Sequence, residues 1–139
     1  MADITADDLT CAGWSIVDDD GFIDLVGPLW HRTIGDVHEF AMMAQRKHRN
    51  RRGLVQGGLL MTFADRSCGM SARFASGAAG LATVQMDSHF VDAARIGDLL
   101  ISRSRVVRST RSLIFTSTEV SVDDRCIVLA QGVFKVMAD

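Results

Sequence analysis

Residues 57–74 read Gly-Gly-Leu-Leu-Met-Thr-Phe-Ala-Asp-Arg-Ser-Cys-Gly-Met-Ser-Ala-Arg-Phe, and this stretch decides the fold. Drawn as a helix, it carries small or apolar side chains on nearly every face. Gly77 and Gly80 follow and end the run. Because a surface helix would show a polar face, we expect this helix to be enclosed by the rest of the protein.

After the helix the sequence changes to the two-residue period of β-strands. One face of the first strand carries Ala82, Val84, Met86, Ser88 and Phe90, and the residues between them, Thr83 included, lie on the other face. Three more strand-like segments follow, at residues 98–108, 112–122 and 125–137. Hairpin signals separate the four strands, at residues 93–97, 109–111 and 123–124. The pattern predicts an antiparallel meander.

The part of the chain before the helix is less regular. Residues 6–14 suit a short helix or a loose arm, while residues 15–17 and 22–26 flank a turn-rich segment and predict a β-hairpin. Residues 37–47 contain alanine and methionine, which favour helix, yet the polar loop that follows favours a strand. The whole order predicts an α+β fold in which a curved antiparallel sheet wraps a long central helix.

Length and composition limit the classes of protein to which the chain can belong. We expect the 139 residues to form one domain, 1–139, with residues 1–14 as an N-terminal arm or short helix. Hydrophobic residues make up 47% of the chain and charged residues 23%, so it can bury a core. The formal net charge of −2 argues against a general nucleic-acid-binding protein, which would be basic.

The cysteines and the N-terminus indicate a cytoplasmic protein. Cys11, Cys68 and Cys126 are widely spaced and odd in number, so they predict neither a disulfide framework nor a zinc site. The N-terminus is acidic and lacks the basic and apolar parts of a secretory signal. No apolar run approaches the roughly 18 residues of a membrane span. We therefore expect reduced thiols, no metal and no membrane partner.

The last predicted strand bears on oligomeric state. Between Cys126 and Met137, both alternating sets of side chains are mostly apolar. A strand in a single-layer sheet should have one solvated face. Two apolar faces therefore predict at least a homodimer, in which a second subunit covers the outer face.

The chemistry centres on residues 48–58 and on Asp65. A helix that begins after Gly57-Gly58 presents unpaired N–H groups, which can polarise a carbonyl or hold an oxyanion. Two turns later comes Asp65, whose neighbours three and four positions away are Met61, Thr62, Cys68 and Gly69. No basic residue pairs with it along the helix, although a surface acid often has such a partner.

Each of these residues also has a structural interpretation. Any glycine pair can form a turn, and His48 and Asn50 can act as loop caps. Asp65 can be a structural acid bonded to a strand hydroxyl or to a backbone N–H. Spacing alone leaves both interpretations open.

The complete string resembles the PaaI-like branch of the hotdog-fold acyl-CoA thioesterases, whose motif runs H-x-N-x-x-G-x-x-H-G-G and is followed by an acid on the central helix. The matching positions are His48, Asn50, Gly53, Gly57, Gly58 and Asp65. Downstream segments, including Ala82-Thr83 and Gly97-Asp98, are also similar to that family. The resemblance runs from about Phe22 to the end of the chain.

This resemblance implies a homodimer or homotetramer with active sites at the subunit interface. The Gly57 N–H would polarise the thioester carbonyl of an acyl-CoA substrate, and the partner's Asp65 would act as nucleophile or general base. Asn50 would position water or substrate, and Thr83 matches a Ser or Thr that helps hold the water. His48 and Gly58 would contact substrate, and coenzyme A would enter only as part of the substrate, with no separate cofactor.

One motif position departs from the family. Gln56 stands where many relatives have histidine. Glutamine can donate and accept hydrogen bonds but cannot carry a proton at neutral pH. Because a thiolate leaves easily, an oxyanion donor and one carboxylate can suffice for hydrolysis. We therefore expect activity to survive, with Gln56 as a polar member of the site.

Two alternatives are weighed against hydrolysis. Gln56 favours a non-catalytic acyl-CoA-binding or regulatory protein, whereas the retained Asp65 opposes it. A hotdog hydratase would need a histidine a few residues after the acid, and the next one is His89. Four arginines lie near the last hairpins: Arg103, Arg105, Arg108 and Arg111. They can either protect a solvated sheet edge by their charge or bind the phosphates of coenzyme A.

Overall fold

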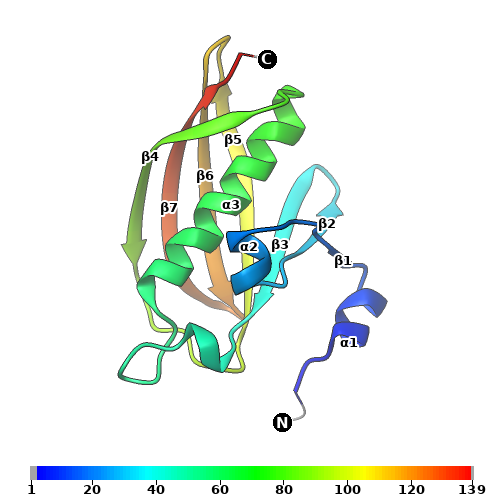
Figure 1. The fold of residues 1–139 in the computed structure, drawn as a ribbon, viewed down its shortest axis with the longest axis vertical. Helices are drawn as coiled ribbons and strands as arrows, with labels where there is room; N and C mark the ends of the chain where they lie inside the picture. The colour runs from blue at the N-terminus through cyan, green and yellow to red at the C-terminus, as the bar shows by residue number, and fades with distance from the viewer. Residues whose placement is uncertain (1–2, 139) are drawn as a thin grey trace.

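The computed structural model describes residues 3–138, within which one antiparallel sheet curves around one long helix (Figure 1). The elements are α1 (Ala6–Cys11), β1 (Ser15–Ile16), α2 (Phe22–Val26), β2 (Trp30–Ile34), β3 (Val37–Met43), η1 (Arg46–His48), α3 (Gly57–Ser76), β4 (Leu81–Phe90), β5 (Leu99–Ser109), β6 (Leu113–Val122) and β7 (Arg125–Val136). The strand order is β1-β2-β3-β5-β6-β7-β4. The predicted α+β architecture, a sheet wrapped around a central helix, is confirmed.

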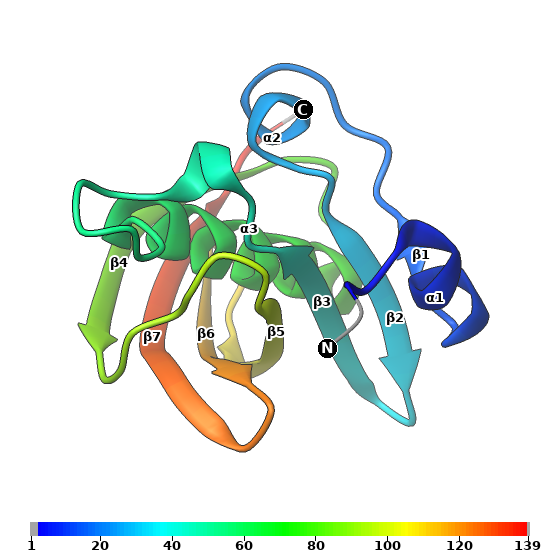
Figure 2. The same ribbon diagram turned by 90° about the horizontal axis from the view of Figure 1, so that it is seen from below.

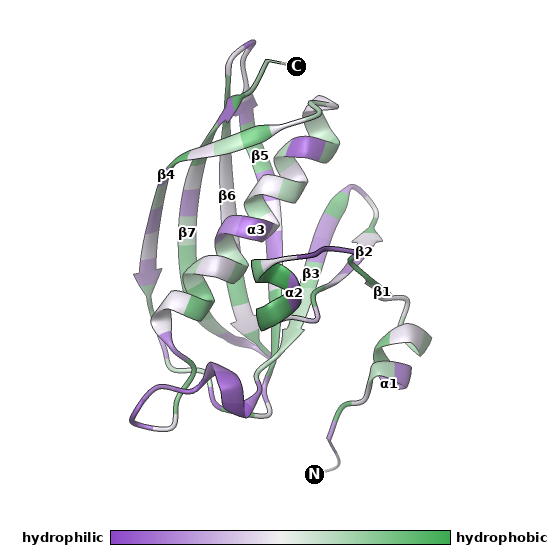
Figure 3. Ribbon diagram, viewed as in Figure 1, coloured by the Kyte–Doolittle hydropathy of each residue, from purple (hydrophilic) through white to green (hydrophobic). Residues whose placement is uncertain are grey.

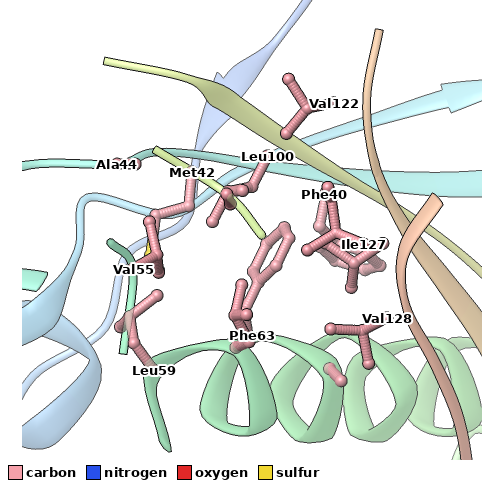
Figure 4. Packing of buried hydrophobic residues seen from close by; sticks show 14 of the residues in the cluster. Phe40, Met42, Ala44, Val55, Leu59, Phe63, Leu100, Val122, Ile127 and Val128 are labelled. Carbon is pink, nitrogen blue, oxygen red and sulfur yellow. The ribbon is translucent and has the colours of Figure 1, made fainter. Parts of the chain in front are cut away.

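The main core lies between α3 and the concave face of the sheet. Phe63 is completely buried and points from α3 toward Phe40, Leu100 and Ile127 (Figure 4). These apolar contacts and the exclusion of water around Phe63 hold the N-terminal half of α3 on the sheet. The predicted enclosure of the helix is confirmed on this side.

The C-terminal half of α3 packs through small side chains. Cys68 and Ala72 are fully buried against Ile114 and Phe134 in a second cluster. Short side chains let a helix approach a sheet closely, because less volume lies between the two backbones. Gly132 on β7 shows how tight this region is, since an added Cβ there would lie 2.9 Å from Met86.

The N-terminal arm covers the opposite face of the sheet. α1 brings Leu9 and the following Trp14 against Trp30 and Ala41, forming a small apolar cluster with Leu99 and Ile101 at its margin. Figure 2 shows α1 beside β2, away from α3. Ala41 lies between Phe40 and Met42, which belong to the main core, so strand alternation places Ala41 on the outer face. Residues 1 and 2 of the predicted arm lie outside the described residues.

The predicted hairpin of residues 15–17 and 22–26 is wrong. Ser15–Ile16 pairs with β2, a strand that the pattern analysis did not assign, and residues 22–26 form the helix α2. Ile23 and Val26, three positions apart, pack on the core, whereas Phe22 and Leu25 are exposed. That spacing is helical and cannot produce alternate burial in a strand.

The ambiguous segment 37–47 resolves into a strand followed by a turn of 3₁₀ helix. β3 pairs with β2 on one side and with β5 on the other. Its central residues, from Glu39 to Met42, are all buried. Packing on both faces therefore outweighs the helical preference of alanine and methionine.

The first of the three predicted hairpins is also wrong. Residues 93–97 connect β4 to β5, but β4 pairs with β7, at the far side of β6. The segment is therefore a crossover, while the β5-β6-β7 meander is confirmed. β4 becomes an edge strand, and its outer edge has no pairing strand within residues 3–138.

A β-bulge changes which residues of β4 face the helix. The register with β7 shifts between Thr83 and Gln85, and Val84 is 59% exposed. The extra residue reverses the alternation, so Thr83 before the bulge and Met86 after it both face α3. The uniform alternation predicted from the sequence placed these two residues on opposite faces.

His48 ties three segments together ahead of α3. Its Nδ1 accepts a hydrogen bond from the Gln45 N–H at 2.9 Å, and its Nε2 donates to the Val26 carbonyl at 2.6 Å. Lys47 donates to the carbonyls of Leu25 and Gly27. These bonds satisfy the C-terminal carbonyls of α2, which the helix cannot satisfy internally.

No helix among residues 3–138 is long and apolar enough to cross a bilayer.

Phe63→Ala is expected to lower the free energy of unfolding by about 3–5 kcal/mol, because it removes a buried ring and leaves a cavity. Phe22→Ala is the matched control, since Phe22 is 61% exposed, and its effect should stay within about 0.5 kcal/mol. Chemical denaturation measures both. Equal effects of the two variants would contradict the packing described for α3.

The stability of the protein is expected to decrease as the pH falls through about 6.5, the ordinary pKa of a histidine side chain. Burial lowers the pKa of His48 and also that of His31, which stacks on Phe40. The unfolded chain therefore takes up protons before the folded chain does, so the stabilisation is complete above pH 6.5 and is lost below it. Denaturant unfolding between pH 7.5 and 5.5 measures the decrease.

His48→Gln keeps one acceptor and one donor but removes the titration, so its unfolding free energy should depend less on pH than that of the wild type. His89 is exposed, so His89→Gln should keep the wild-type slope. A wild-type slope in His48→Gln would contradict this assignment.

Candidate active site

The loop before α3 holds the start of the helix in place. The Gln56 N–H donates to the His48 carbonyl at 2.8 Å, and the Val55 N–H donates to the Ala94 carbonyl at 2.9 Å. Val55 is buried, so it anchors the loop in the core. The loop is the hydrophilic stretch just ahead of α3 in Figure 3. The His48 ring is buried, and both of its nitrogens are hydrogen-bonded within the chain. His48 therefore affects a substrate indirectly, by holding the loop in place.

Asn50 and Gly53 form the turn within this loop. The Asn50 side-chain oxygen accepts from the N–H groups of Arg52 and Leu54, at 2.9 and 3.1 Å. Gly53 has a φ of +80°, a conformation that favours glycine. The Asn50 amide nitrogen has no acceptor within residues 3–138 and lines an open hollow beside Gln56. Asn50 can therefore build the turn through its oxygen while its NH₂ group remains available to donate.

The first residues of α3 carry free hydrogen-bond donors. The N–H groups of Gly57 and Gly58 have no acceptor in the part of the chain that the structure describes. Gln56 is the N-cap residue, yet its exposed side chain makes no capping bond. The helix dipole adds partial positive charge at this end. The arrangement suits a carbonyl oxygen that gains negative charge during a reaction.

Asp65 and Thr83 form a second group, two turns along α3. The Thr83 hydroxyl donates to Asp65 Oδ1 at 2.7 Å across the gap between α3 and β4. Asp65 is half-buried and has no ion-pair partner within residues 3–138. The hydroxyl fixes the direction of the carboxylate, and the second carboxylate oxygen accepts no hydrogen bond from these residues.

The structure separates the predicted site residues into two groups within one chain. The first group contains His48, Asn50, Gln56, Gly57 and Gly58, and the second contains Asp65 and Thr83. Gly57 and Asp65 are eight positions apart on α3, which corresponds to about 12 Å along the helix axis. An oxyanion donor must lie within about 3 Å of its oxygen. The two groups of a single chain therefore cannot act on one carbonyl.

No second nucleophile competes with Asp65 on this part of α3. Cys68 is fully buried against the sheet, and burial raises the pKa of its thiol to about 11. The thiol therefore stays protonated and unreactive at neutral pH. Among residues 3–138, no three His, Cys, Asp or Glu side chains cluster in a way that could hold a metal ion.

Among the four arginines near the last hairpins, Arg103 is held by other side chains. Arg103 makes an ion pair with Glu39 on the outer face of the sheet and also donates to Ser121. Arg32 pairs with the same carboxylate. Arg103 therefore has a structural role, and its guanidinium is occupied.

A pocket that the sequence did not predict continues from Asp65 toward the C-terminal end of α3. Its volume is about 340 Å³, and its walls include Gly69, Arg73 and Phe134. Asp65, Gly69 and Arg73 recur every four residues, so helical spacing alone already places them on one stripe. Nothing in the local pattern indicated that this stripe borders a cavity.

Comparison with known proteins agrees with this geometry. The sequence pattern of the thioesterase superfamily matches residues 52–127. A Pseudomonas aeruginosa protein that is named provisionally as an esterase is 33% identical over 116 residues, which cover 81% of this chain and 85% of that protein.

Solved structures share the fold. Zebrafish thioesterase superfamily member 2 superposes with a TM-score of 0.77 at 22% identity, over 86% of this chain and 89% of that chain. A hypothetical thioesterase protein of Streptococcus pneumoniae, in its crystal structure with coenzyme A, superposes with a TM-score of 0.73 at 18% identity, over 80% of this chain and 90% of that chain.

The helix-in-sheet fold, the match over residues 52–127 and the 33% identical relative lead to one conclusion. The chain belongs to the thioesterase superfamily, the hotdog-fold family of thioester hydrolases.

Proposed function

We propose that this protein is an acyl-CoA thioesterase that converts an acyl- or aryl-CoA and water to a carboxylic acid and free CoA. The observation that carries the proposal is the division of the site into an oxyanion-binding helix start at Gly57 and a carboxylate at Asp65. Together these groups supply what thioester hydrolysis requires, a stabilised oxyanion and an activated nucleophile. Coenzyme A enters as part of the substrate, with no separate cofactor.

The complete site in this proposal combines two subunits. Because Gly57 and Asp65 of one chain are about 12 Å apart, Gly57 of one subunit acts together with the partner subunit's Asp65. The unpaired edge of β4 supports this assembly, since exposed strand edges readily pair with another chain. On the outer face of β7, Leu129 is 46% exposed, which suits a further subunit contact. The unit of function is a homodimer, alone or within a homotetramer.

The proposed reaction begins at the thioester carbonyl carbon. The Gly57 N–H donates to the carbonyl oxygen, and Gly58 leaves room for the substrate beside the backbone. In the general-base route, Asp65 takes a proton from water as the water oxygen bonds to the carbonyl carbon. The C–S bond then breaks, and the CoA thiolate leaves and takes up a proton. In the nucleophilic route, Asp65 itself bonds to the carbon, and the C–S bond breaks to release the CoA thiolate, which takes up a proton. Water then hydrolyses the resulting mixed anhydride, which yields the carboxylic acid and restores Asp65.

The remaining polar residues orient the reactants. Thr83 directs the carboxylate through its 2.7 Å hydrogen bond. Gln56 and the Asn50 amide lie beside the helix start, where each can donate to the substrate or to water. His48 holds the loop that carries them. Since glutamine cannot exchange a proton at neutral pH, all proton transfer falls to Asp65.

A non-catalytic acyl-CoA-binding protein is the second candidate, favoured by Gln56 in place of histidine. The Asp65–Thr83 pair opposes it, because a carboxylate that a hydroxyl orients and that no cation within residues 3–138 occupies suits proton transfer from water, which binding alone does not require. Purified protein incubated with a panel of short, medium and aryl acyl-CoAs distinguishes the two. Tight binding without thiol release from any of them would establish the second candidate.

Asp65→Asn is expected to lower kcat/KM for thiol release by about 10²–10⁴-fold, because the variant cannot accept a proton. Thr83→Val should lower it by about tenfold through loss of the hydrogen bond to the carboxylate, and Thr83→Ser should restore it. Asp87→Asn on the same strand removes an exposed acid and serves as the control. Wild-type rates in Asp65→Asn would refute the mechanism even if hydrolysis occurs.

Mixing two inactive variants tests the shared site. In Gly57→Ala the new methyl group lies 3.4 Å from the Phe90 ring, an ordinary contact, so the fold should persist while the methyl blocks the approach to the N–H. A dimer of this variant with Asp65→Asn contains one site with both native groups. We therefore expect activity to reappear after subunit exchange. Absence of activity in a confirmed mixed dimer would place the complete site within one chain.

A further inference from the structure

The pocket that continues from Asp65 is built for a small polar group. It has a volume of about 340 Å³, near the lower end for ligand-binding pockets. α3 contributes Asp65, Arg66, Gly69 and Arg73, while Thr83 and Phe134 come from the sheet. Figure 3 shows hydrophilic bands in the middle and C-terminal part of α3, between apolar or neutral turns. A pocket for a long hydrocarbon chain would have apolar walls throughout.

Gly69 makes room for this pocket. It occupies the helix position between Arg66 and Arg73, so a side chain there would stand between the two guanidinium groups. An added Cβ would also lie 3.3 Å from the Phe134 ring, closer than nearly all natural Cβ contacts. Gly69 and Phe134 both line the pocket, and the absence of a side chain at position 69 keeps the space beside the ring open.

The charges in the pocket are unequally compensated. Arg66 donates to Asp19 at 2.8 Å, which neutralises it. Asp65 holds the hydroxyl of Thr83. Arg73 is exposed, and its guanidinium has no acidic partner and no hydrogen bond in the described part of the chain, although the residue lines the pocket. The pocket thus has the Asp65 carboxylate at one end and, farther along α3, the Arg73 guanidinium, which has no acidic partner in the described part of the chain.

The direction of helical side chains brings that cation toward the site. Long side chains on an α-helix lean toward its N-terminus and cover the preceding turn. Such a direction carries the Arg73 side chain over Gly69, and all three residues, Asp65, Gly69 and Arg73, line the same pocket. A substituent placed between the two would meet a planar donor group suited to a carboxylate.

We infer that this pocket holds the acyl part of the substrate and that Arg73 selects short acyl groups ending in a carboxylate. This inference rests on the proposed function, because it assigns the far end of the same site. The thioester carbonyl lies at Asp65, and the acyl chain runs along α3 over Gly69. Its terminal carboxylate accepts hydrogen bonds from the Arg73 guanidinium. Arg73 is then a specificity residue with no part in bond cleavage.

Arg73 also lies in the last turn of α3, where a cation stabilises the helix dipole. That structural role would affect the stability of the protein and would treat all substrates alike. A pair of substrates that differ only in charge separates the two roles. Glutaryl-CoA and 5-methylhexanoyl-CoA form such a pair, since a terminal isopropyl group replaces a carboxylate of similar size.

The experiment measures kcat/KM for both substrates in the wild type, Arg73→Gln, Arg73→Lys and Lys135→Gln. We expect the wild type to prefer glutaryl-CoA. Arg73→Gln should lower kcat/KM for glutaryl-CoA by about tenfold or more, as expected for loss of a charged hydrogen bond, and leave 5-methylhexanoyl-CoA unchanged. Arg73→Lys should recover part of the loss. Lys135→Gln removes the same charge from the exposed β7 position and should change neither value.

Three results would overturn the inference. The first is a wild type that prefers the uncharged substrate. The second is an Arg73→Gln variant in which kcat/KM falls equally for both substrates. The third is an Arg73→Gln variant in which kcat/KM changes for neither substrate. An equal loss of kcat/KM would mean either that Arg73 contacts the CoA moiety or that it stabilises the fold. A thermal unfolding scan separates these two causes, because only the second lowers the Tm. If no CoA ester is hydrolysed by the wild type, the proposed function itself fails. Hydrolysis without selectivity for the carboxylate refutes only the role of Arg73.

Discussion

The close packing of α3 on the concave sheet is the constraint on which the rest of the molecule depends. Phe63 fills the space beneath the N-terminal half of the helix, whereas small residues such as Cys68 and Ala72 bring the C-terminal half close to β6 and β7. Each chemically important position then follows from its place on this one rigid element. The helix start exposes the N–H of Gly57, and the edge that faces β4 presents Asp65.

The same helix explains why the site is divided. A straight helix keeps residues eight positions apart at a fixed separation of about 12 Å, and no local rearrangement can bring them together. In the proposed function, a second subunit supplies the other half of the site without any bending of the helix. The unpaired edge of β4, beside the Asp65–Thr83 pair, is the natural place for that subunit. Assembly and catalysis are therefore linked in the proposed function through one structural element.

Motif residues that the family resemblance assigns to substrate also serve the fold. His48 has both ring nitrogens bonded, and the Asn50 side-chain oxygen closes the turn that contains Gly53. Their spacing matters because it fixes the loop, and the loop fixes the direction of the Gly57 N–H. A motif in the sequence can therefore mark the support of a site as well as the groups that react.

Local periodicity was enough to predict α3, the last four strands, the loop at residues 48–58 and Asp65 as the acid to examine, because neighbours along the chain control these features. Long-range pairing decided the remainder. β4 lies beside β7, and the bulge at Val84 turns Thr83 toward Asp65. Residues 22–26 form a helix that packs Ile23 and Val26 on the core and whose last carbonyls bind Lys47 and His48. The pocket between Asp65 and Arg73 also required the fold, because Phe134 comes from the far end of the chain.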